Sequence, residues 1–334
     1  MTGREERKTQ IENKINKILC GKPKLFSNYV SYCLSSGQQP TTTKSYLLTA
    51  IAFMEYIKNE VTIDSVKEIM PLDISNYLNA IRTRTLKDGS VVPTSTSYRA
   101  TTYSALRNFF DFLVMNKIIA ENPVSGMKRP KVTDDVSQEH LSLSEMKSVL
   151  DKVRDGSGVV GQSRCRENNM KTRNMAMIRM LLELGIRCSA LTCIDVEDID
   201  LENKKIVYKD KGEKTFEKPI SNELVDCLKA WLYDRSKLNP KTNALFVSEK
   251  RRRCSYGAVL NLVKKFTKSA TGSAMSVHKM RHSAITAMYE MNGNDIVHAA
   301  KFAGHSNVTT TQRYINTDYS EKDIELAAQL GAAI

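Results

Sequence analysis

The chain has 334 residues, and its 50 Lys and Arg side chains outnumber its 37 Asp and Glu side chains, which gives a formal net charge of +13. This length suits two domains, and the positive charge favours nucleic acid over a membrane as the partner, because no basic amphipathic helix with an aromatic face stands out. The seven cysteines lack a C-x-x-C pair, and the sequence contains neither a bilayer-spanning apolar run nor a signal-peptide pattern, so we expect reduced thiols and a cytoplasmic protein.

Helical periodicity dominates residues 1–120, for which we predict a compact all-helical domain. Residues 5–36 are predicted to form a polar helix followed by a second, more apolar one. Apolar side chains recur at helical spacing in three further stretches: the segment that starts at Thr41–Thr43, Asp73–Arg84 and Thr94–Ile118. Arg99 and Arg107 lie eight positions apart on the last of these helices, so they can share a face and contact a phosphate backbone. A solvated helix face is an equally simple interpretation of either residue alone.

Residues 121–140 differ in character and predict an interdomain linker. Pro123 and Pro130 prevent a helix from continuing through this segment. Three basic residues within it are suited to lie along phosphates: Lys128, Arg129 and Lys131.

The second domain is predicted at residues 141–318, and it mixes helices with a small antiparallel β-sheet. Ser142 and Glu145 form a capping-box pattern before a helix, and Thr172–Leu184 is apolar enough to be a core helix that ends at Gly185. Alternating patterns over Lys204–Asp210 and Lys214–Ile220 predict two strands joined by a turn. The fold class predicted for the whole chain is therefore mainly α with a small antiparallel sheet (α+β).

Two helices follow this predicted hairpin, one over Ser221–Leu238 and one over Ser255–Ser269. A basic run precedes the second helix, and we expect its arginines to anchor phosphates: Arg251, Arg252 and Arg253. A last short apolar helix is predicted within residues 319–334.

The segment from Val277 to Tyr314 carries the strongest chemical signal in the chain. Ser276 is placed to cap one helix, and Asn294 is placed to cap a second helix that stops at Gly304. His278 and Arg281 are three positions apart, so they share one face of the first helix.

His305 and Tyr314 follow these helices. A guanidinium binds phosphate oxygens in a bidentate fork, an imidazole donates or accepts a proton, and a phenol can be a nucleophile. A histidine at a helix terminus is more often a cap, and most tyrosines pack in the core, so the spacing alone leaves catalysis open.

Six positions in order resemble the tyrosine recombinase, or phage integrase, family, and most resemble the Xer and integrative-element integrases. They occur in I-R-C-S-A-L (Arg187), D-K-G-E-K (Lys211), V-H-K-M-R-H (His278 and Arg281), G-H-S (His305) and the later R-Y (Tyr314). The resemblance implies a site-specific DNA recombinase whose helical core-binding domain and catalytic domain form a C-shaped clamp on DNA, with the linker crossing the duplex.

The resemblance also implies a role for each residue. Tyr314 would attack a phosphodiester to form a 3′-phosphotyrosyl intermediate, Arg187 and Arg281 would bind the non-bridging oxygens, and His305 would donate to the same oxygens. His278 would accept the proton of the phenol, and Lys211 would protonate the leaving 5′-oxygen, with Lys214 as the second candidate. Lys279 is expected to contact DNA, and no metal or cofactor is expected.

One departure from the family pattern leaves alternatives open. The family commonly has an acidic residue where this chain has Ala190, so orientation of the catalytic groups can differ here. The rivals are a type IB topoisomerase, a catalytically silent DNA-binding regulator and, weakest, a metal-dependent nuclease. The expected partners are duplex DNA with inverted-repeat core sites and further copies of the chain, as a dimer on a site and a tetramer in a synapse. The C-terminal helix at 319–334 would make these protomer contacts in a nucleoid-associated protein.

Overall fold

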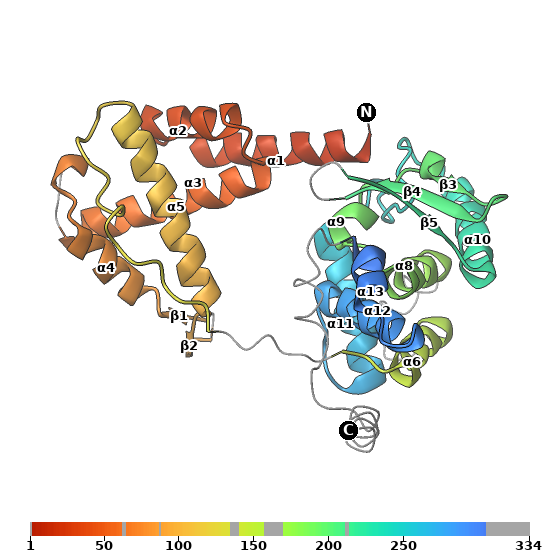
Figure 1. Cartoon of the computed structure of the whole chain (residues 1–334). Coiled ribbons are helices and arrows are strands. Elements are labelled where there is room, and N and C mark those ends of the chain that lie inside the picture. Colours follow the sequence, from red (N-terminus) through yellow and green to blue (C-terminus); the bar gives the residue numbers. More distant parts are fainter. Residues whose placement is uncertain are drawn as a thin grey trace, which may run out of the picture. The chain divides into compact units, whose positions relative to one another are not determined.

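The computed structural model describes residues 2–61, 65–86, 88–133, 140–156, 170–210 and 214–304. The chain divides into two compact units, a helical unit at Glu5–Asp135 and a mixed unit at Val136–Ile334 together with Met1–Arg4. Both units are built mainly of helices, and each contains one small antiparallel sheet (Figure 1). The predicted fold class is confirmed.

The helical unit packs its helices around a core of aromatic side chains. The helices are α1 (Gly3–Leu19), α2 (Lys24–Ser35), α3 (Pro40–Tyr56), α4 (Pro71–Ala80) and α5 (Thr96–Met115), with short helical turns at Ile57–Val61 and Val66–Glu68. Helix α5 contacts α2, α3 and α4, and its Phe109 and Phe110 are fully buried. The Phe109 ring lies 5.1 Å from that of Tyr29 in an edge-on arrangement, which aromatic pairs favour.

A β-hairpin that the sequence analysis missed follows α4. Strands β1 (Thr83–Thr85) and β2 (Val91–Pro93) pair antiparallel, so the predicted extension of helix to Arg84 was wrong. Threonines and valines favour strands, and Gly89 takes the positive φ of 83° that the connecting turn requires.

Part of the segment predicted as a linker packs onto the helical unit. Val124 is fully buried in that unit's core, and the Tyr103 hydroxyl donates to the Met127 carbonyl oxygen at 2.6 Å. These contacts fix the chain as far as Met127, before the basic residues begin.

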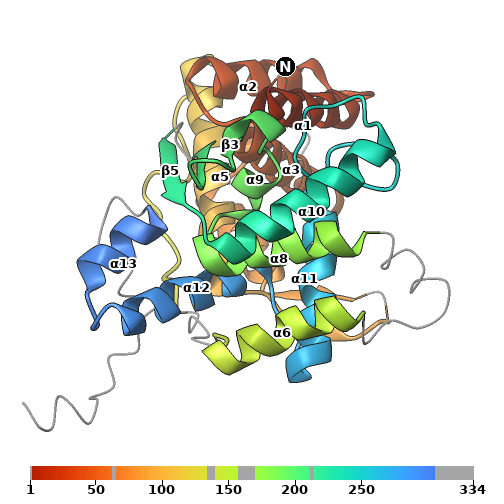
Figure 2. The same cartoon turned by 90° about the vertical axis from the view of Figure 1, so that its right-hand side faces the viewer.

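The mixed unit is centred on one apolar helix. Its helices are α6 (Leu143–Asp155), α8 (Lys171–Leu184), α9 (Cys188–Leu191), α10 (Asn222–Leu238), α11 (Tyr256–Thr271), α12 (Val277–Met291) and α13 (Ile296–Ala303), with a 3₁₀ turn at Val196–Asp198. Helix α8 contacts α6, α10, α11 and α12, which surround it (Figure 2). The predicted capping box is confirmed, since Ser142 and Glu145 each accept the other's backbone N–H.

A three-stranded antiparallel sheet of order β3-β4-β5 lies at one end of these helices (Figures 1 and 2). Its strands are β3 (Ile199–Asp200), β4 (Lys205–Lys209) and β5 (Thr215–Pro219), so the predicted hairpin is confirmed. In the β4–β5 register, Ile206 faces Lys218, and both side chains are buried. A lysine therefore occupies an inward position of this sheet.

The helices that carry the strongest motif begin and end close to the predicted positions. Ser276 caps α12 by accepting from the Lys279 N–H, and Gly304 ends α13 with a φ of 64°. The predicted cap at Asn294 was wrong, because Asp295 caps α13 by accepting from the N–H groups of Val297 and His298. None of the helices in the described ranges has the length and apolarity needed to cross a membrane.

Candidate active site

Three of the six residues predicted to be catalytic belong to the part of the chain that the structure describes. Arg187, His278 and Arg281 come from the α8–α9 connection and from the first turns of α12. The other three predicted catalytic residues lie outside the described residues: Lys211, His305 and Tyr314. The C-terminal helix predicted at 319–334 lies outside them as well. Lys214, the second candidate for the turn lysine, is exposed at the start of β5, where its carbonyl oxygen accepts from the Asp210 N–H.

Arg187 is held by a buried carboxylate that the sequence analysis did not identify as a site residue. Its Nη1 donates to Oδ2 of Asp210 at 2.5 Å. The Asp210 side chain is 2% exposed and that of Arg187 is 28% exposed, so the arginine reaches solvent while its partner does not. The signal for Asp210 was its place at the end of a strand, directly before the predicted catalytic turn.

Arg281 is buried and bridges the ends of two helices. Its Nη1 donates to the Gly185 carbonyl oxygen at 2.6 Å, and its Nη2 donates to the Ala303 carbonyl oxygen. Only 2% of the residue is exposed. These carbonyls lie where α8 and α13 end, and a cation is stabilised there because helix C-terminal carbonyls carry partial negative charge.

Lys218 reinforces the same junction, and the sequence analysis missed it. Its Nζ donates to the carbonyl oxygens of Leu184 and Phe302, each at 2.6 Å, and lies 3.9 Å from the centre of the Phe302 ring. Burial, followed by the positive charge of Arg281, lowers the pKa of Lys218 to about 7, against a raising effect of Asp210. The available signal was the alternation of β5, which places Lys218 on the same face as Phe216.

His278 lies in the first turn of α12 and reaches solvent. Partial burial, and then the positive charges of Arg281 and Arg187, lower its pKa below the usual value of a histidine. The imidazole is therefore neutral at pH 7, the form that accepts a proton.

The charges of this cluster do not cancel. Among the described residues, the Lys218 amine is affected by two arginines, Arg187 and Arg281, and by one carboxylate, that of Asp210. An excess of positive charge beside a partly exposed guanidinium favours an anionic ligand such as a phosphodiester.

Two other histidines have a packing role in this unit. His282 is 3% exposed, and its ring lies 5.9 Å from that of His140. The neighbouring Ser283 hydroxyl oxygen accepts from the Leu141 N–H at 2.7 Å. These contacts attach the start of the mixed unit to α12. Among the described residues, no group of three or more His, Cys, Asp or Glu side chains is arranged to hold a metal ion.

One predicted phosphate contact needs correction. Arg253 forms an ion pair with Asp195 at 2.5 Å, its side chain is 7% exposed, and it also donates to the carbonyl oxygens of Thr192 and Ile194. Arg251 and Arg252 are exposed. Three adjacent arginines look alike in sequence, but the backbone bridge between Val247 and Arg253 turns only the last one inward.

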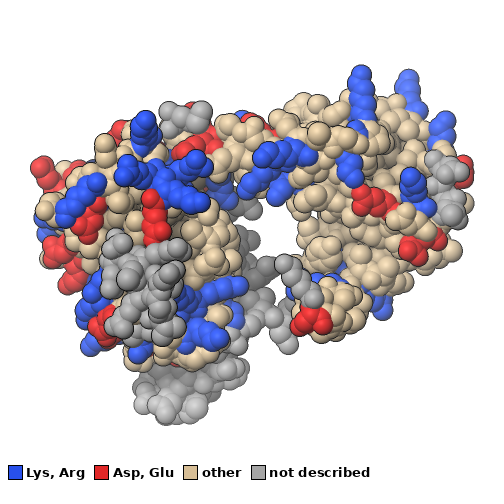
Figure 3. Space-filling model, turned by 180° about the vertical axis from the view of Figure 1, so that it is seen from behind, with Lys and Arg blue, Asp and Glu red and all other residues tan. Residues whose placement is uncertain are grey.

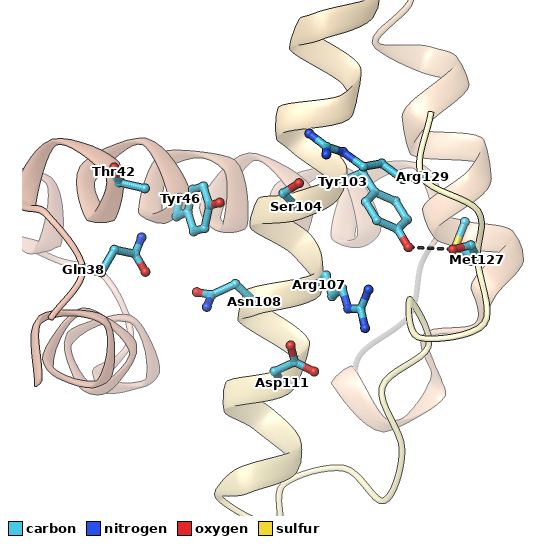
Figure 4. A pocket seen from close by; sticks show the side chains of 10 residues that line it. All are labelled: Gln38, Thr42, Tyr46, Tyr103, Ser104, Arg107, Asn108, Asp111, Met127 and Arg129. Atoms are coloured by element: carbon cyan, nitrogen blue, oxygen red, sulfur yellow. Dashed lines mark hydrogen bonds between the residues drawn. The ribbon is translucent and has the colours of Figure 1, made fainter. Parts of the chain in front are cut away.

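The helical unit contains a separate groove of about 640 Å³ (Figure 4). It is lined by residues from the α2–α3 connection, α3, α5 and the segment after α5: Gln38, Thr42, Tyr46, Tyr103, Ser104, Arg107, Asn108, Asp111, Met127 and Arg129. Two predicted DNA contacts, Arg107 and Arg129, are among them and are exposed, whereas Arg99 is not part of the lining. Lys128 and Lys131 are exposed, and Lys279 is half-buried in α12.

The orientation of the Asn108 side chain in this groove is fixed by a hydrogen bond from the core. Its Oδ1 accepts from the buried Tyr29 hydroxyl at 2.8 Å. The amide nitrogen is then the atom left to face the groove, so Asn108 presents a donor there. On the face shown in Figure 3, Lys and Arg side chains are spread over both units with acidic ones between them.

Comparison with known sequences identifies relatives along most of the chain. The model of the phage integrase family matches residues 162–321. The tyrosine recombinase XerC of Caldanaerobacter subterraneus subsp. tengcongensis is 31% identical over 324 residues, covering 89% of this chain and 83% of the relative. XerC of Psychromonas ingrahamii is 29% identical, covering 88% and 92%.

Solved structures of low sequence identity share the fold. The XerH site-specific recombinase in its post-cleavage complex with palindromic difH aligns with a TM-score of 0.65 at 19% identity, covering 88% of this chain and 80% of that one. The Tn1549 transposon integrase with circular intermediate DNA gives 0.63 at 17% identity, covering 91% and 98%. A λ integrase dimer bound to a core site gives 0.62 at 15% identity, covering 89% and 97%.

Proposed function

The chain belongs to the phage integrase family of tyrosine recombinases and is a tyrosine-type site-specific recombinase, and we propose that Tyr314 is its nucleophile. Attack of the phenol oxygen on a DNA phosphodiester forms a 3′-phosphotyrosyl bond and releases a 5′-hydroxyl. Attack of a 5′-hydroxyl on that bond then rejoins a strand and frees the tyrosine, so no high-energy cofactor is consumed.

The observation that carries this proposal is the convergence of Arg187, His278 and Arg281 on one cationic cluster. Arg281 donates to the carbonyl of Gly185, which precedes Arg187 by two positions, although the two arginines are far apart in sequence. Arg187 and Arg281 stabilise the negative charge that develops on the non-bridging oxygens of the pentacoordinate phosphorus. Loss of one such donor typically slows the chemical step about 10²–10³-fold.

Proton transfers complete the reaction. His278, neutral at pH 7 because its pKa is lowered, accepts the phenol proton. Lys211 protonates the leaving 5′-oxygen, and His305 donates to a non-bridging oxygen. Cleavage should fall as the pH drops through the lowered pKa of His278, because the imidazolium cannot accept a proton.

Asp210 supplies the carboxylate that the family pattern places at position 190. Its ion pair holds the guanidinium of Arg187 from the buried side, while Ala190 is buried and apolar. A carboxylate moved from α9 to the end of β4 can orient the same arginine, so the departure at Ala190 is compatible with an active enzyme.

The groove of the helical unit binds the DNA core site in this proposal. Arg107 and Arg129 contact phosphates there, and the exposed Arg251 and Arg252 add phosphate contacts from the mixed unit. The λ integrase and XerH structures hold DNA, which supports DNA as the ligand of the shared fold. We further propose that two protomers occupy inverted half-sites, that two such dimers form a tetrameric synapse, and that residues 319–334 link the protomers.

The experiment is a trapping assay. The full chain is incubated with nicked duplexes that carry candidate inverted repeats, and a covalent adduct is sought on a denaturing gel. We expect an adduct with wild type and with Tyr319→Phe, and none with Tyr314→Phe, while all three bind DNA equally. An adduct formed by Tyr314→Phe would assign the nucleophile elsewhere, and relaxation of plasmid that lacks any recognition site would favour a topoisomerase.

A further inference from the structure

Lys218 is the one lysine among the buried residues of the described ranges, with 8% of its surface exposed. Burying an ammonium is costly because its hydration is lost, so an apolar residue of similar length would stabilise this position better. The catalytic steps described above do not use Lys218. Its presence in the core therefore calls for another role.

The hydrogen bonds of Lys218 run parallel to those of Arg281. Lys218 donates to the carbonyl oxygens of Leu184 and Phe302. Arg281 donates to the carbonyl oxygen of the next residue at each helix end, Gly185 and Ala303. The two cations thus join consecutive carbonyls at the end of α8 to consecutive carbonyls at the end of α13.

Both of these helix ends lead directly to proposed catalytic residues. Arg187 follows Gly185 by two positions, and His305 follows Ala303 by two positions. A shift of one helix end against the other would therefore move a phosphate-binding guanidinium relative to the start of the segment that carries His305.

The junction is packed too closely to hold larger residues. A Cβ on Gly185 would come within 2.9 Å of the Phe302 ring, and one on Gly304 would come within 2.5 Å of the Phe216 ring. Both glycines also have a positive φ, of 56° and 64°. Close packing sets the distance between the two ends, and Lys218 and Arg281 set their register.

We propose that Lys218 is a positioning residue for strand cleavage, which holds the C-terminal ends of α8 and α13 in register through their paired carbonyls. The inference rests on the proposed function, because its consequence is a change in cleavage rate. Lys218 touches neither the scissile phosphate nor the nucleophile in this proposal, and it acts through the chain segments that lead to Arg187 and His305.

The protonation state of Lys218 makes the contact between the ends of α8 and α13 depend on pH. The charged groups that act on its amine are Arg281 on α12, Arg187 directly before α9, and Asp210 directly after β4. With its pKa lowered to about 7, the amine loses its charge above neutral pH, and its hydrogen bonds to the two carbonyls weaken. Lys218 therefore holds the two helix ends together most strongly at and below neutral pH.

The test compares Lys218→Met with Lys205→Met in single-turnover cleavage of the nicked inverted-repeat duplex. Lys205 lies on the adjacent strand β4, where its side chain is 40% exposed and makes a long ion pair with Glu217, at 3.5 Å. We expect Lys205→Met to behave as wild type. We expect Lys218→Met to bind DNA normally but to cleave about 10²-fold more slowly, the scale of effect that a small misplacement of catalytic groups produces.

Stability and pH separate positioning from a simple structural role. Lys218→Met should melt at or above the wild-type temperature, because a buried amine is replaced by an apolar side chain. Its cleavage rate should also lack the wild-type decline that accompanies deprotonation of Lys218 as the pH rises from about 6 to 9. Slow cleavage together with undiminished stability supports the proposal.

Two results would overturn it. One is cleavage by Lys218→Met within twofold of wild type, and the other is a lower melting temperature with a parallel loss of DNA binding. If wild type forms no adduct on any site, the proposed function fails, and this inference fails with it. An active wild type beside an equally active Lys218→Met overturns only the inference.

Discussion

The mixed unit and the helical unit both place cationic side chains at a proposed site, but they hold them differently. Arg281 and Lys218 are buried, and their donors are bound to helix carbonyls. Arg107 and Arg129 line an open groove and are exposed. Buried cations are fixed in place at a desolvation cost, whereas exposed cations retain their hydration and cost little.

The difference separates two tasks on one substrate. The fixed charge of Arg281 in a low-dielectric site stabilises a transition state, because it needs no reorganisation when the reaction occurs, whereas Lys218 holds the helix ends that position the site. Exposed charge releases counterions from DNA and gives affinity that depends on salt. Substitutions in the first set should change the cleavage rate, and those in the second should change the dissociation constant.

Among the substitutions that separate the two units, the largest effect is expected for Arg187→Ala. Loss of this guanidinium should slow single-turnover cleavage of saturated DNA by about 10²–10³-fold, because one stabilising donor set is removed from the phosphate. Binding should change little, as measured by gel shift at fixed salt. Asp210→Asn should slow cleavage less, since the amide still accepts one hydrogen bond. If Arg187→Ala weakened DNA binding as much as it slowed cleavage, the distinction between the two units would be wrong.

Arg253→Ala tests whether this arginine belongs to the fold or to the DNA interface. Its removal leaves the carboxylate of Asp195 without its buried partner, and the free energy of unfolding should drop by roughly 3–5 kcal/mol. The matched control is Arg252→Ala, which should leave stability unchanged in chemical denaturation. If Arg253→Ala keeps wild-type stability but binds DNA more weakly, the original prediction that Arg253 contacts a phosphate is correct.

A double substitution, Arg107→Ala with Arg129→Ala, tests the groove. The DNA dissociation constant should rise for all sequences alike. The plot of the log of the association constant against log salt should become less steep by about 1.8 if both residues contact phosphates. Cleavage at saturating DNA should stay near the wild-type rate. An unchanged salt slope would exclude both residues from the interface.

The smallest effect is expected at Asn108, where we predict a change in sequence preference. With Oδ1 bound to Tyr29, its amide can donate to a base acceptor, and one good base contact discriminates by roughly 1–3 kcal/mol. Selection from a randomised half-site should show relaxed preference at one position for Asn108→Ala. Tyr29→Phe should give a weaker version of the same change, since it frees the amide to rotate.

The sequence predicted those parts of the molecule that depend on local signals. Capping residues at Ser142 and Ser276 and the alternation around β4 and β5 gave helices and a hairpin close to those observed. Short motifs also selected Arg187, His278 and Arg281, which the fold brings to one cluster.

Contacts between distant segments could not be predicted in this way. Nothing in the neighbourhood of Asp210 or Lys218 shows that one pairs with Arg187 and the other with the ends of α8 and α13. For the same reason Arg253 was grouped with Arg251 and Arg252, although its partner Asp195 lies far away in sequence. The predictions for Lys211, His305 and Tyr314 concern residues outside the described ranges and remain predictions.

The most direct test of the account is to identify the residue that carries DNA in the covalent adduct. The trapped complex is digested with protease and nuclease, and the nucleotide-bearing peptide is sequenced by mass spectrometry. The account predicts a single modified residue, Tyr314, joined to a 3′-phosphate. Modification at Tyr319 or another side chain, or linkage to a 5′-phosphate, would contradict it.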